Sequence, residues 1–191
     1  MVSNVGSAAT LYHGCRYHGW HRVSNLDHDY WMTQAIALAL QAGVAQEVPV
    51  GAIIVNSQGQ LLSQGQNRRQ RDQDPTAHAE ILVIRAASQI LQDWHLLGCT
   101  LYVTLEPCPM CAGAILQARL QTLVYGASDP KTGSIDSVLN LPNSPASFHR
   151  LTVISGVKQI ECKQLLQNWF KQLRQAKSSA SIQLANHQDQ Q

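Results

Sequence analysis

The chain has 191 residues, which is enough for one domain with a buried core and short for two. Hydrophobic residues make up 45% of it and charged residues 14%, which is typical of a globular protein with few charges. The net charge of +2 is too small to give the whole protein a positive electrostatic field that would require a polyanionic partner. No apolar run approaches the roughly 20 residues of a membrane span.

The cysteines indicate a reducing compartment. Five are present, an odd number without the regular spacing of a disulfide framework: Cys15, Cys99, Cys108, Cys111 and Cys162. The N-terminus also lacks the apolar core of a secretory signal. We therefore expect the protein in the cytoplasm.

Residues 1–26 differ from the rest of the chain. They mix Gly, Ser and Tyr with three histidines around Cys15, and follow the period of neither a helix nor a strand. The cluster could be a second metal site or part of an extension without fixed structure. Because metal ligands are usually paired at tighter spacing, we predict a disordered extension over residues 1–26.

The first part of the domain predicts a helix followed by a β-hairpin. From Asp27, a residue type that caps helices, apolar residues recur at spacings of three and four as far as Gly43. Residues 48–55 are nearly all apolar and predict a strand buried on both faces. A turn at 56–59 leads to a partner strand at 61–66.

Helices and strands alternate in the rest of the chain. Asp74-Pro75-Thr76 predicts a helix start that places His78 and Glu80 in the first turn. Further strands are expected at 100–105, 122–125 and 151–154, and further helices at 112–120, weakly within 134–147, and along an apolar stripe at 165–173. The Ser- and Gln-rich residues 178–191 predict a disordered tail.

This alternation indicates one domain over residues 27–177. Strands that alternate with helices form a mixed sheet with helices on both faces. We therefore predict an α/β protein, a three-layer α/β/α sandwich with a mixed five-stranded sheet.

Two short motifs carry the chemistry, His78-Ala79-Glu80 and Pro107-Cys108-Pro109-Met110-Cys111. One imidazole and two thiolates, from His78, Cys108 and Cys111, suit Zn²⁺, and three protein ligands leave the fourth position for water, as in catalytic sites. Zinc lowers the pKa of such a water, and a nearby carboxylate can carry its proton to a substrate. The motifs predict a zinc hydrolase site with Glu80 as the catalytic residue.

The sequence around these motifs resembles the bacterial tRNA-specific adenosine deaminases of the cytidine deaminase-like superfamily. His-x-Glu followed by Pro-Cys-x-x-Cys is the signature of zinc nucleobase deaminases in general. The finer resemblance covers residues 27–177 and rests on residues 47–55, Asn67-Arg68, 74–80, 101–114 and 126–133. It implies a cytidine deaminase-like fold.

The resemblance also implies a reaction, a cofactor and partners. The reaction is hydrolytic deamination of adenosine to inosine at the wobble position of tRNA, foremost the arginine tRNA with anticodon ACG. A zinc-bound hydroxide would attack C6 of adenine, with Glu80 as the proton shuttle. One Zn²⁺ per subunit, a homodimer and a tRNA anticodon stem-loop as partner are implied as well. Substrate contacts are implied for six residues: Val50, Asn67, Ala79, Pro107, Asp129 and Lys131.

Alternatives remain open at this point. Asn67, Asp129 and Lys131 are also ordinary turn residues. The basic residues at 68–71 and along 150–177 could bind phosphates or form solvated faces. The zinc motif is equally compatible with a deaminase of free bases or nucleotides. An RNA-binding subunit that zinc stabilises and that catalyses nothing is the alternative from another class, although it would not need Glu80.

Overall fold

The computed structural model describes residues 26–188, and of residue 177 and residues 179–188 it describes the backbone alone. The elements in chain order are α1 (His28–Val44), β1 (Gly51–Val55), β2 (Leu61–Gln66), α2 (Arg69–Asp72), α3 (Ala79–Leu91), β3 (Thr100–Leu105), α4 (Pro109–Gln117), β4 (Thr122–Ala127), β5 (Thr152–Ser155) and α5 (Gln159–Gln188).

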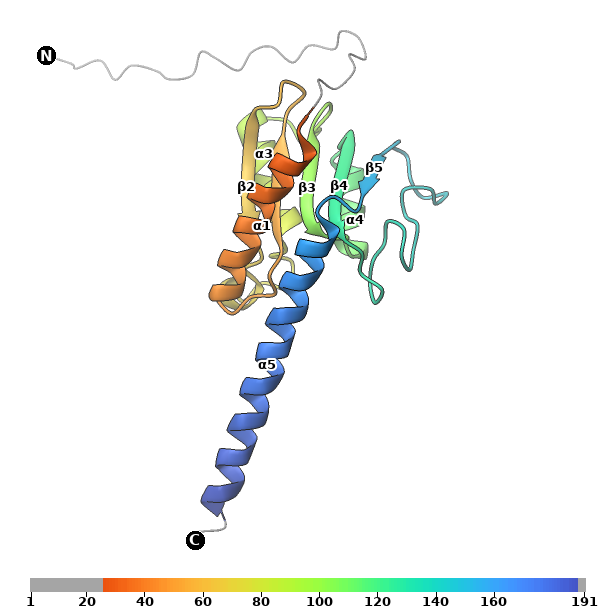
Figure 1. Ribbon diagram of the computed structural model, residues 1–191. Helices are drawn as coiled ribbons and strands as arrows, with labels where there is room; N and C mark the ends of the chain where they lie inside the picture. Colours follow the sequence, from red (N-terminus) through yellow and green to blue (C-terminus); the bar gives the residue numbers. More distant parts are fainter. Residues whose placement is uncertain (1–25, 189–191) are drawn as a thin grey trace, which may run out of the picture.

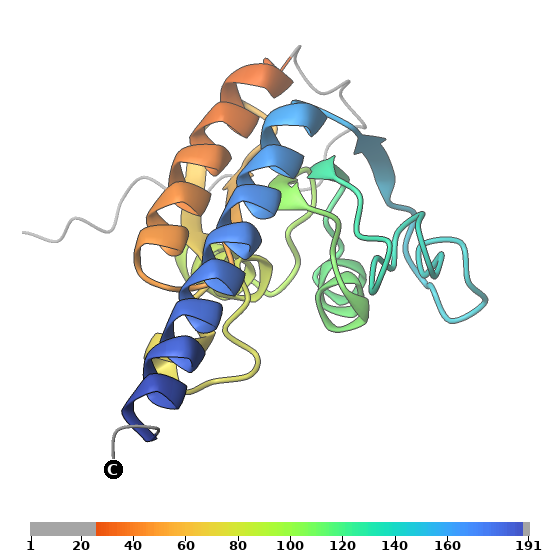
Figure 2. The same cartoon turned by 60° about the horizontal axis from the view of Figure 1, so that its bottom comes forward.

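The strands form one mixed sheet in the order β2-β1-β3-β4-β5. β1 pairs antiparallel with both β2 and β3, whereas β3 with β4 and β4 with β5 pair in parallel. α1 and α5 lie side by side on one face of the sheet, and α3 and α4 cover the other face (Figures 1 and 2). The predicted three-layer sandwich with a mixed five-stranded sheet is confirmed.

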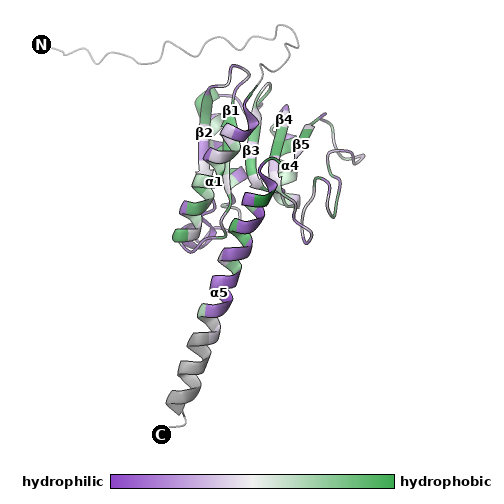
Figure 3. Cartoon of the chain, viewed as in Figure 1, coloured by the Kyte–Doolittle hydropathy of each residue, from purple (hydrophilic) through white to green (hydrophobic). Residues whose placement is uncertain are grey.

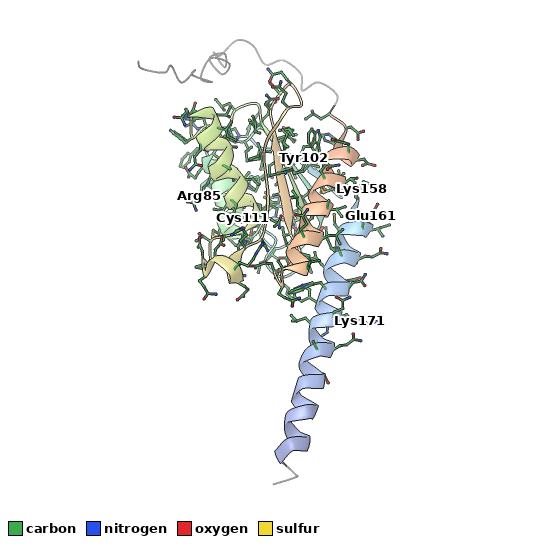
Figure 4. All side chains as sticks on the ribbon, turned by 90° about the vertical axis from the view of Figure 1, so that its left-hand side faces the viewer. Arg85, Tyr102, Cys111, Lys158, Glu161 and Lys171 are labelled. Carbon is green, nitrogen blue, oxygen red and sulfur yellow. The ribbon has the colours of Figure 1, made fainter. Side chains whose placement is uncertain are left out.

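Each face of the sheet has its own core. Because side chains alternate along a strand, Leu101 and Val103 of β3 join the cluster under α3 and α4, and Tyr102 joins the cluster under α1 and α5. Figure 4, which views the sheet along its edge, places Tyr102 on the α1 side and Cys111 on the α3 side. Figure 3 shows hydrophobic strands and a largely hydrophilic α5 where this helix extends past the sheet.

Small residues allow two helices to approach the sheet closely. A Cβ at Gly51 of β1 would lie 2.7 Å from the Ala39 nitrogen and closer still to the Ala35 carbonyl oxygen of α1. Gly126 of β4 likewise leaves room for the side chain of Cys162 in α5, 2.9 Å from the Cys162 Cβ. The spacing of these layers therefore depends on the absence of a side chain at two positions.

The regular elements follow the sequence closely. The predicted limits of β2 and β3 are confirmed, and all residues of β1 are buried, as expected for a strand covered on both faces. The Asp27 carboxylate accepts a hydrogen bond from the Tyr30 N–H at 2.9 Å and caps α1 as predicted.

Two local predictions were wrong, and one short element was not predicted. Asp74 does not begin a helix, because its carboxylate accepts from the N–H and the hydroxyl of Thr76 and folds a turn, so α3 begins only at Ala79. Residues 134–147 form turns instead of a weak helix, since prolines at 142 and 145 interrupt any helix there. The four-residue α2 was missed because it is too short to display a helical period.

The C-terminal helix is longer than expected. The sequence predicts a domain end at 177 and a tail without structure, whereas α5 continues to Gln188. The extension predicted over residues 1–26 lies, except for residue 26, outside the described part of the chain. Along residues 26–188 no helix combines the length and the apolar character that crossing a membrane requires.

Gly51→Ala is expected to lower the free energy of unfolding by about 3 kcal/mol, because the added methyl group must push α1 away from β1. Urea denaturation measures the change. Gly113→Ala is the matched control: Gly113 lies within α4 with open space at its Cβ position, so alanine should stabilise the protein by about 0.5–1 kcal/mol. A Gly51→Ala protein as stable as the wild type would contradict the close approach.

Candidate active site

The first half of the site is the beginning of α3. His78 occupies the N-cap position with an extended backbone (φ −75°, ψ 150°), and Glu80 is the second residue of the helix. The Glu80 carboxylate is 4% exposed, whereas the His78 ring is half-buried. The turn at 74–77 and the helix therefore direct the imidazole towards a pocket and keep the carboxylate beneath its surface.

The second half is the beginning of α4, directly after β3. Cys108 is the N-cap residue, Pro109 opens the helix, and Cys111 is its third residue. Proline suits this position because the missing N–H would have no partner there. Since N–H groups and the positive end of the helix dipole gather at a helix start, α3 and α4 both favour negative charge at the point where they meet.

The three predicted ligands lie together. His78 Nδ1 is 3.8 Å from Cys108 Sγ and 3.5 Å from Cys111 Sγ, and the donor atoms all lie within 4.8 Å of one another. Bond lengths of Zn²⁺ to nitrogen and sulfur in a tetrahedron correspond to a nitrogen–sulfur separation of about 3.6 Å. The donor set and its spacing therefore fit one zinc ion.

The donor atoms also affect one another's protonation. A hydrogen bond from the Cys111 thiol lowers the pKa of Cys108 to about 4. The same bond, together with burial, raises the pKa of Cys111, and the bond to Cys108 raises the pKa of His78. Burial raises the pKa of Glu80, so this carboxylate takes up a proton more readily than an exposed one.

A pocket of about 100 Å³ opens over these residues. Of the residues predicted to act on metal or substrate, six line it: Val50, Asn67, His78, Glu80, Cys108 and Asp129. Arg69, one of the basic residues at 68–71 that could bind phosphates, also lines it. Four further lining residues were not predicted as site residues: Val48, Leu105, Glu106 and Thr132. The pocket thus exposes two of the three predicted metal ligands, His78 and Cys108, together with the carboxylate and part of the expected substrate contacts, whereas Cys111 is buried behind them.

Asn67 joins two walls of the pocket. Its Oδ1 accepts the Ala79 N–H at 2.9 Å and its Nδ2 donates to the Val48 carbonyl at 3.1 Å. An amide oxygen accepts two hydrogen bonds and an amide nitrogen donates two, so Asn67 retains capacity for a ligand. The buried Ala79 contributes a backbone contact to Asn67 at the base of α3.

The remaining predicted contacts differ in position. Pro107 is buried, and its carbonyl accepts the Ser134 N–H at 2.9 Å. The Asp129 carboxylate accepts from the Lys131 N–H and the Thr132 hydroxyl at 2.9 and 2.6 Å, which shapes the loop after β4. The structure places Lys131 on the exposed outside of this loop, and it does not line the pocket.

Glu106 is a residue that the sequence reasoning missed. It is 2% exposed and accepts hydrogen bonds from the N–H groups of Asp129, Ile135, Asp136 and Ser137 and from the Ser137 hydroxyl. Burial alone would raise the pKa of Glu106, but these hydrogen bonds lower it. The sequence did contain a signal for this role. Glu106 stands between an apolar strand and the Pro-Cys motif, where it is expected to be buried, and a buried carboxylate needs several hydrogen-bond donors.

Gly133 belongs to the same arrangement. A Cβ at this position would lie 2.5 Å from the Glu106 carboxyl carbon and from the Asp129 carbonyl oxygen. The loop at 127–137 can therefore close over Glu106 only with glycine here. Glu106 fixes the wall of the pocket that carries Asp129 and Thr132 to the strand that leads into the metal ligands.

Comparisons with known proteins place the chain in a family. A family profile described as MafB19-like deaminase matches residues 26–174. The tRNA-specific adenosine deaminase of Bacillus subtilis is 42% identical over 157 residues, which are 82% of this chain and 97% of that protein. The Haemophilus influenzae enzyme of the same name is 45% identical over 76% of this chain and 84% of its own. The chain belongs to the tRNA-specific adenosine deaminase family.

Solved structures agree with this family. A structure from a study of A-to-I editing by tRNA:A34 deaminases superposes with a TM-score of 0.70 at 43% identity, and the match covers 72% of this chain and 99% of that one. The cytidine deaminase-like fold is thereby confirmed. A guanine deaminase from Nitrosomonas europaea, at 24% identity and a TM-score of 0.64, covers 78% of this chain and 86% of its own and shares the fold.

Family members also occur within longer proteins. A tRNA(Ile)-lysidine synthase from Deinococcus deserti is 45% identical over 147 residues. These residues are 77% of this chain but only 27% of that protein.

Glu106→Gln is expected to destabilise the protein by about 2–3 kcal/mol, because an amide group in this position turns N–H donors towards the donors of the loop. Urea denaturation at neutral pH measures the loss. Ser137→Ala, which removes one donor and leaves the carboxylate, should cost about 1 kcal/mol. If the free energy of unfolding fell by the same small amount in Glu106→Gln and Ser137→Ala, the hydrogen bonds of Glu106 would not hold this loop in place.

Proposed function

We propose that the protein is a zinc-dependent deaminase that converts adenosine to inosine at the wobble position of tRNA. The observation that carries the proposal is the convergence of His78, Cys108 and Cys111 next to a pocket that the buried Glu80 lines. A structural zinc site has no use for such a carboxylate, whereas hydrolysis requires a group that moves protons.

Each residue of the pocket has a role in this proposal. His78, Cys108 and Cys111 hold one Zn²⁺ per subunit, and a bound zinc supplies a water nucleophile at neutral pH. Glu80 would accept one proton of that water and donate it to the ring nitrogen next to the reacting carbon, and it would then take the proton of the added hydroxyl group and pass it to the amino group that leaves as ammonia. Burial, which raises the pKa of Glu80, suits a group that must hold a proton between two steps.

The substrate contacts are proposals of the same kind. The free hydrogen-bonding positions of the Asn67 amide suit the edge of a purine, and the buried Val50 forms an apolar wall for its ring. Ala79 and Pro107 are buried and do not line the pocket, so in this proposal they support the walls around the base. Asp129 is placed at the rim to accept a ribose 2′-OH, which distinguishes RNA from DNA. Lys131, on the outside of that loop, would contact the RNA beyond the target nucleotide.

The relatives suggest the partners. The names of the Bacillus and Haemophilus relatives and the tRNA:A34 deaminase structure support tRNA as the substrate. By the resemblance of the sequence, we propose a homodimer that acts in the cytoplasm on the anticodon stem-loop of the arginine tRNA with anticodon ACG. The target base must leave its stack to enter the pocket, and in a single-stranded loop this costs only a few kcal/mol.

The decisive experiment measures inosine formation in an anticodon stem-loop with adenosine at the wobble position. Free adenosine, guanine and cytosine are assayed in parallel for ammonia release. We expect inosine at the wobble position alone. Ammonia from a free base without inosine would favour a free-base deaminase, whose fold this chain shares. No turnover by folded, zinc-loaded protein would favour a binding subunit.

Glu80→Gln is expected to lower kcat on the stem-loop by about 10²–10⁴-fold, because the amide cannot carry the proton. Zinc content, measured by elemental analysis, should stay at the wild-type level, since Glu80 is not among the metal ligands. His78→Ala is the contrasting variant and should lose both zinc and activity. A Glu80→Gln enzyme with near-normal kcat would falsify the proton-shuttle role.

A further inference from the structure

The three arginines next to Asn67 have different partners. Arg68 donates two hydrogen bonds to the Asp72 carboxylate, at 2.8 and 2.7 Å. Arg71 donates to the Asn67 carbonyl at 2.9 Å, and its Nε lies 3.7 Å from the Glu47 carboxylate. Arg69, by contrast, has no ion pair and no side-chain hydrogen bond within residues 26–188. One cation of this group is therefore available to a ligand.

The backbone that carries Arg69 is firmly held. One oxygen of Glu47, a carboxylate that is 2% exposed, accepts the N–H groups of Gln70 and Arg71, each at 2.9 Å. The Arg68 N–H donates to the Ala77 carbonyl at 3.0 Å, which ties this segment to the residue before His78. The position of Arg69 relative to the proposed metal ligands is thus fixed by backbone hydrogen bonds on both sides.

Arg69 lines the pocket together with His78, Asn67 and Asp129, and its side chain is exposed. The other charged residues of this lining are acidic: Glu80, Glu106 and Asp129. An unpaired guanidinium at an otherwise acidic pocket has no function in hydrolysis, because Arg keeps its proton throughout. Its five N–H groups match an anionic group of the substrate, and guanidinium pairs well with phosphate oxygens.

We propose that Arg69 is a substrate-binding residue that holds a phosphate adjacent to the target nucleotide. The inference rests on the proposed function. Base and ribose are neutral, so the phosphates are the only anions that an RNA substrate brings to the pocket. Arg69 then makes the site prefer an adenosine within a polynucleotide over a free nucleoside or base, without touching the reacting atoms.

The test compares Arg69→Gln with Arg68→Gln, which removes the same charge from the neighbouring residue that is paired with Asp72. Steady-state kinetics on the stem-loop are measured over a series of salt concentrations. Arg69→Gln should raise KM about tenfold with kcat within about twofold. The slope of log(kcat/KM) against log[salt] should decrease by about 0.7, the value for one phosphate contact on a single strand. Arg69→Lys should have a KM between those of the wild type and Arg69→Gln, since lysine keeps the positive charge but cannot donate the paired hydrogen bonds of a guanidinium group.

A second measurement locates the phosphate. Two stem-loops carry a neutral methylphosphonate, one on the 5′ side and one on the 3′ side of the target adenosine. With one of these stem-loops, the KM of the wild type should rise to the value that Arg69→Gln shows on the unmodified stem-loop. The KM of Arg69→Gln should not rise further with that stem-loop. The proposal would be overturned if each methylphosphonate raised the KM of Arg69→Gln as much as it raises that of the wild type. Equal KM and equal salt slope in Arg69→Gln and Arg68→Gln would also overturn it. A wild type that forms no inosine at all would instead overturn the proposed function, which separates the two failures.

Discussion

The active site depends on two helices that begin at the same end of the sheet and on the same face. α3 follows the hairpin β1–β2, and α4 follows the central strand β3, so residues 30 and 33 positions apart meet at one point. Two sulfurs and an imidazole nitrogen gather where both helix dipoles are positive. Glu80 lies in the first turn of α3, Asn67 accepts the N–H of the first residue of α3, and Pro107 directly precedes the N-cap of α4, so their positions follow from these two helix starts.

Three buried glutamates surround this point, and they differ in what their carboxylates bind. Glu47 and Glu106 are surrounded by backbone N–H groups and fix α2 and the loop after β4. Glu80, equally buried, lies next to the metal ligands instead. A carboxylate that accepts backbone N–H groups fixes the segment that carries them, whereas the carboxylate beside the proposed metal ligands is free to exchange protons in the proposed mechanism. Glu47 and Glu106 thus support segments next to the pocket, and Glu80 supplies the reactive group of the proposed mechanism.

Much of this could be predicted from the sequence because it is encoded locally. The turn that leads into β2, the apolar run of β3 and the Asp27 cap depend on neighbouring residues. The His-x-Glu and Pro-Cys-x-x-Cys motifs each place their reactive side chains at a fixed short spacing. The unpredicted parts depend on partners distant in sequence. α2 exists because Glu47 accepts its N–H groups, and the loop at 134–137 is shaped by Glu106, 28 to 31 positions earlier. The spacing of apolar residues along the chain cannot predict hydrogen bonds between residues so far apart in sequence.

The burial of the cysteines has a consequence for redox chemistry. Of the four that the structure describes, Cys99, Cys111 and Cys162 are buried, and Cys162 is enclosed against Gly126 with its pKa raised to about 12 by burial. Cys108 alone in this set is accessible, and its thiolate is the form that oxidants attack. An oxidant therefore meets Cys108, a proposed zinc ligand, before it meets the cysteines of the core. If Cys108 holds zinc as proposed, oxidative damage begins with loss of the ion and of turnover, while the packing of the sheet stays intact.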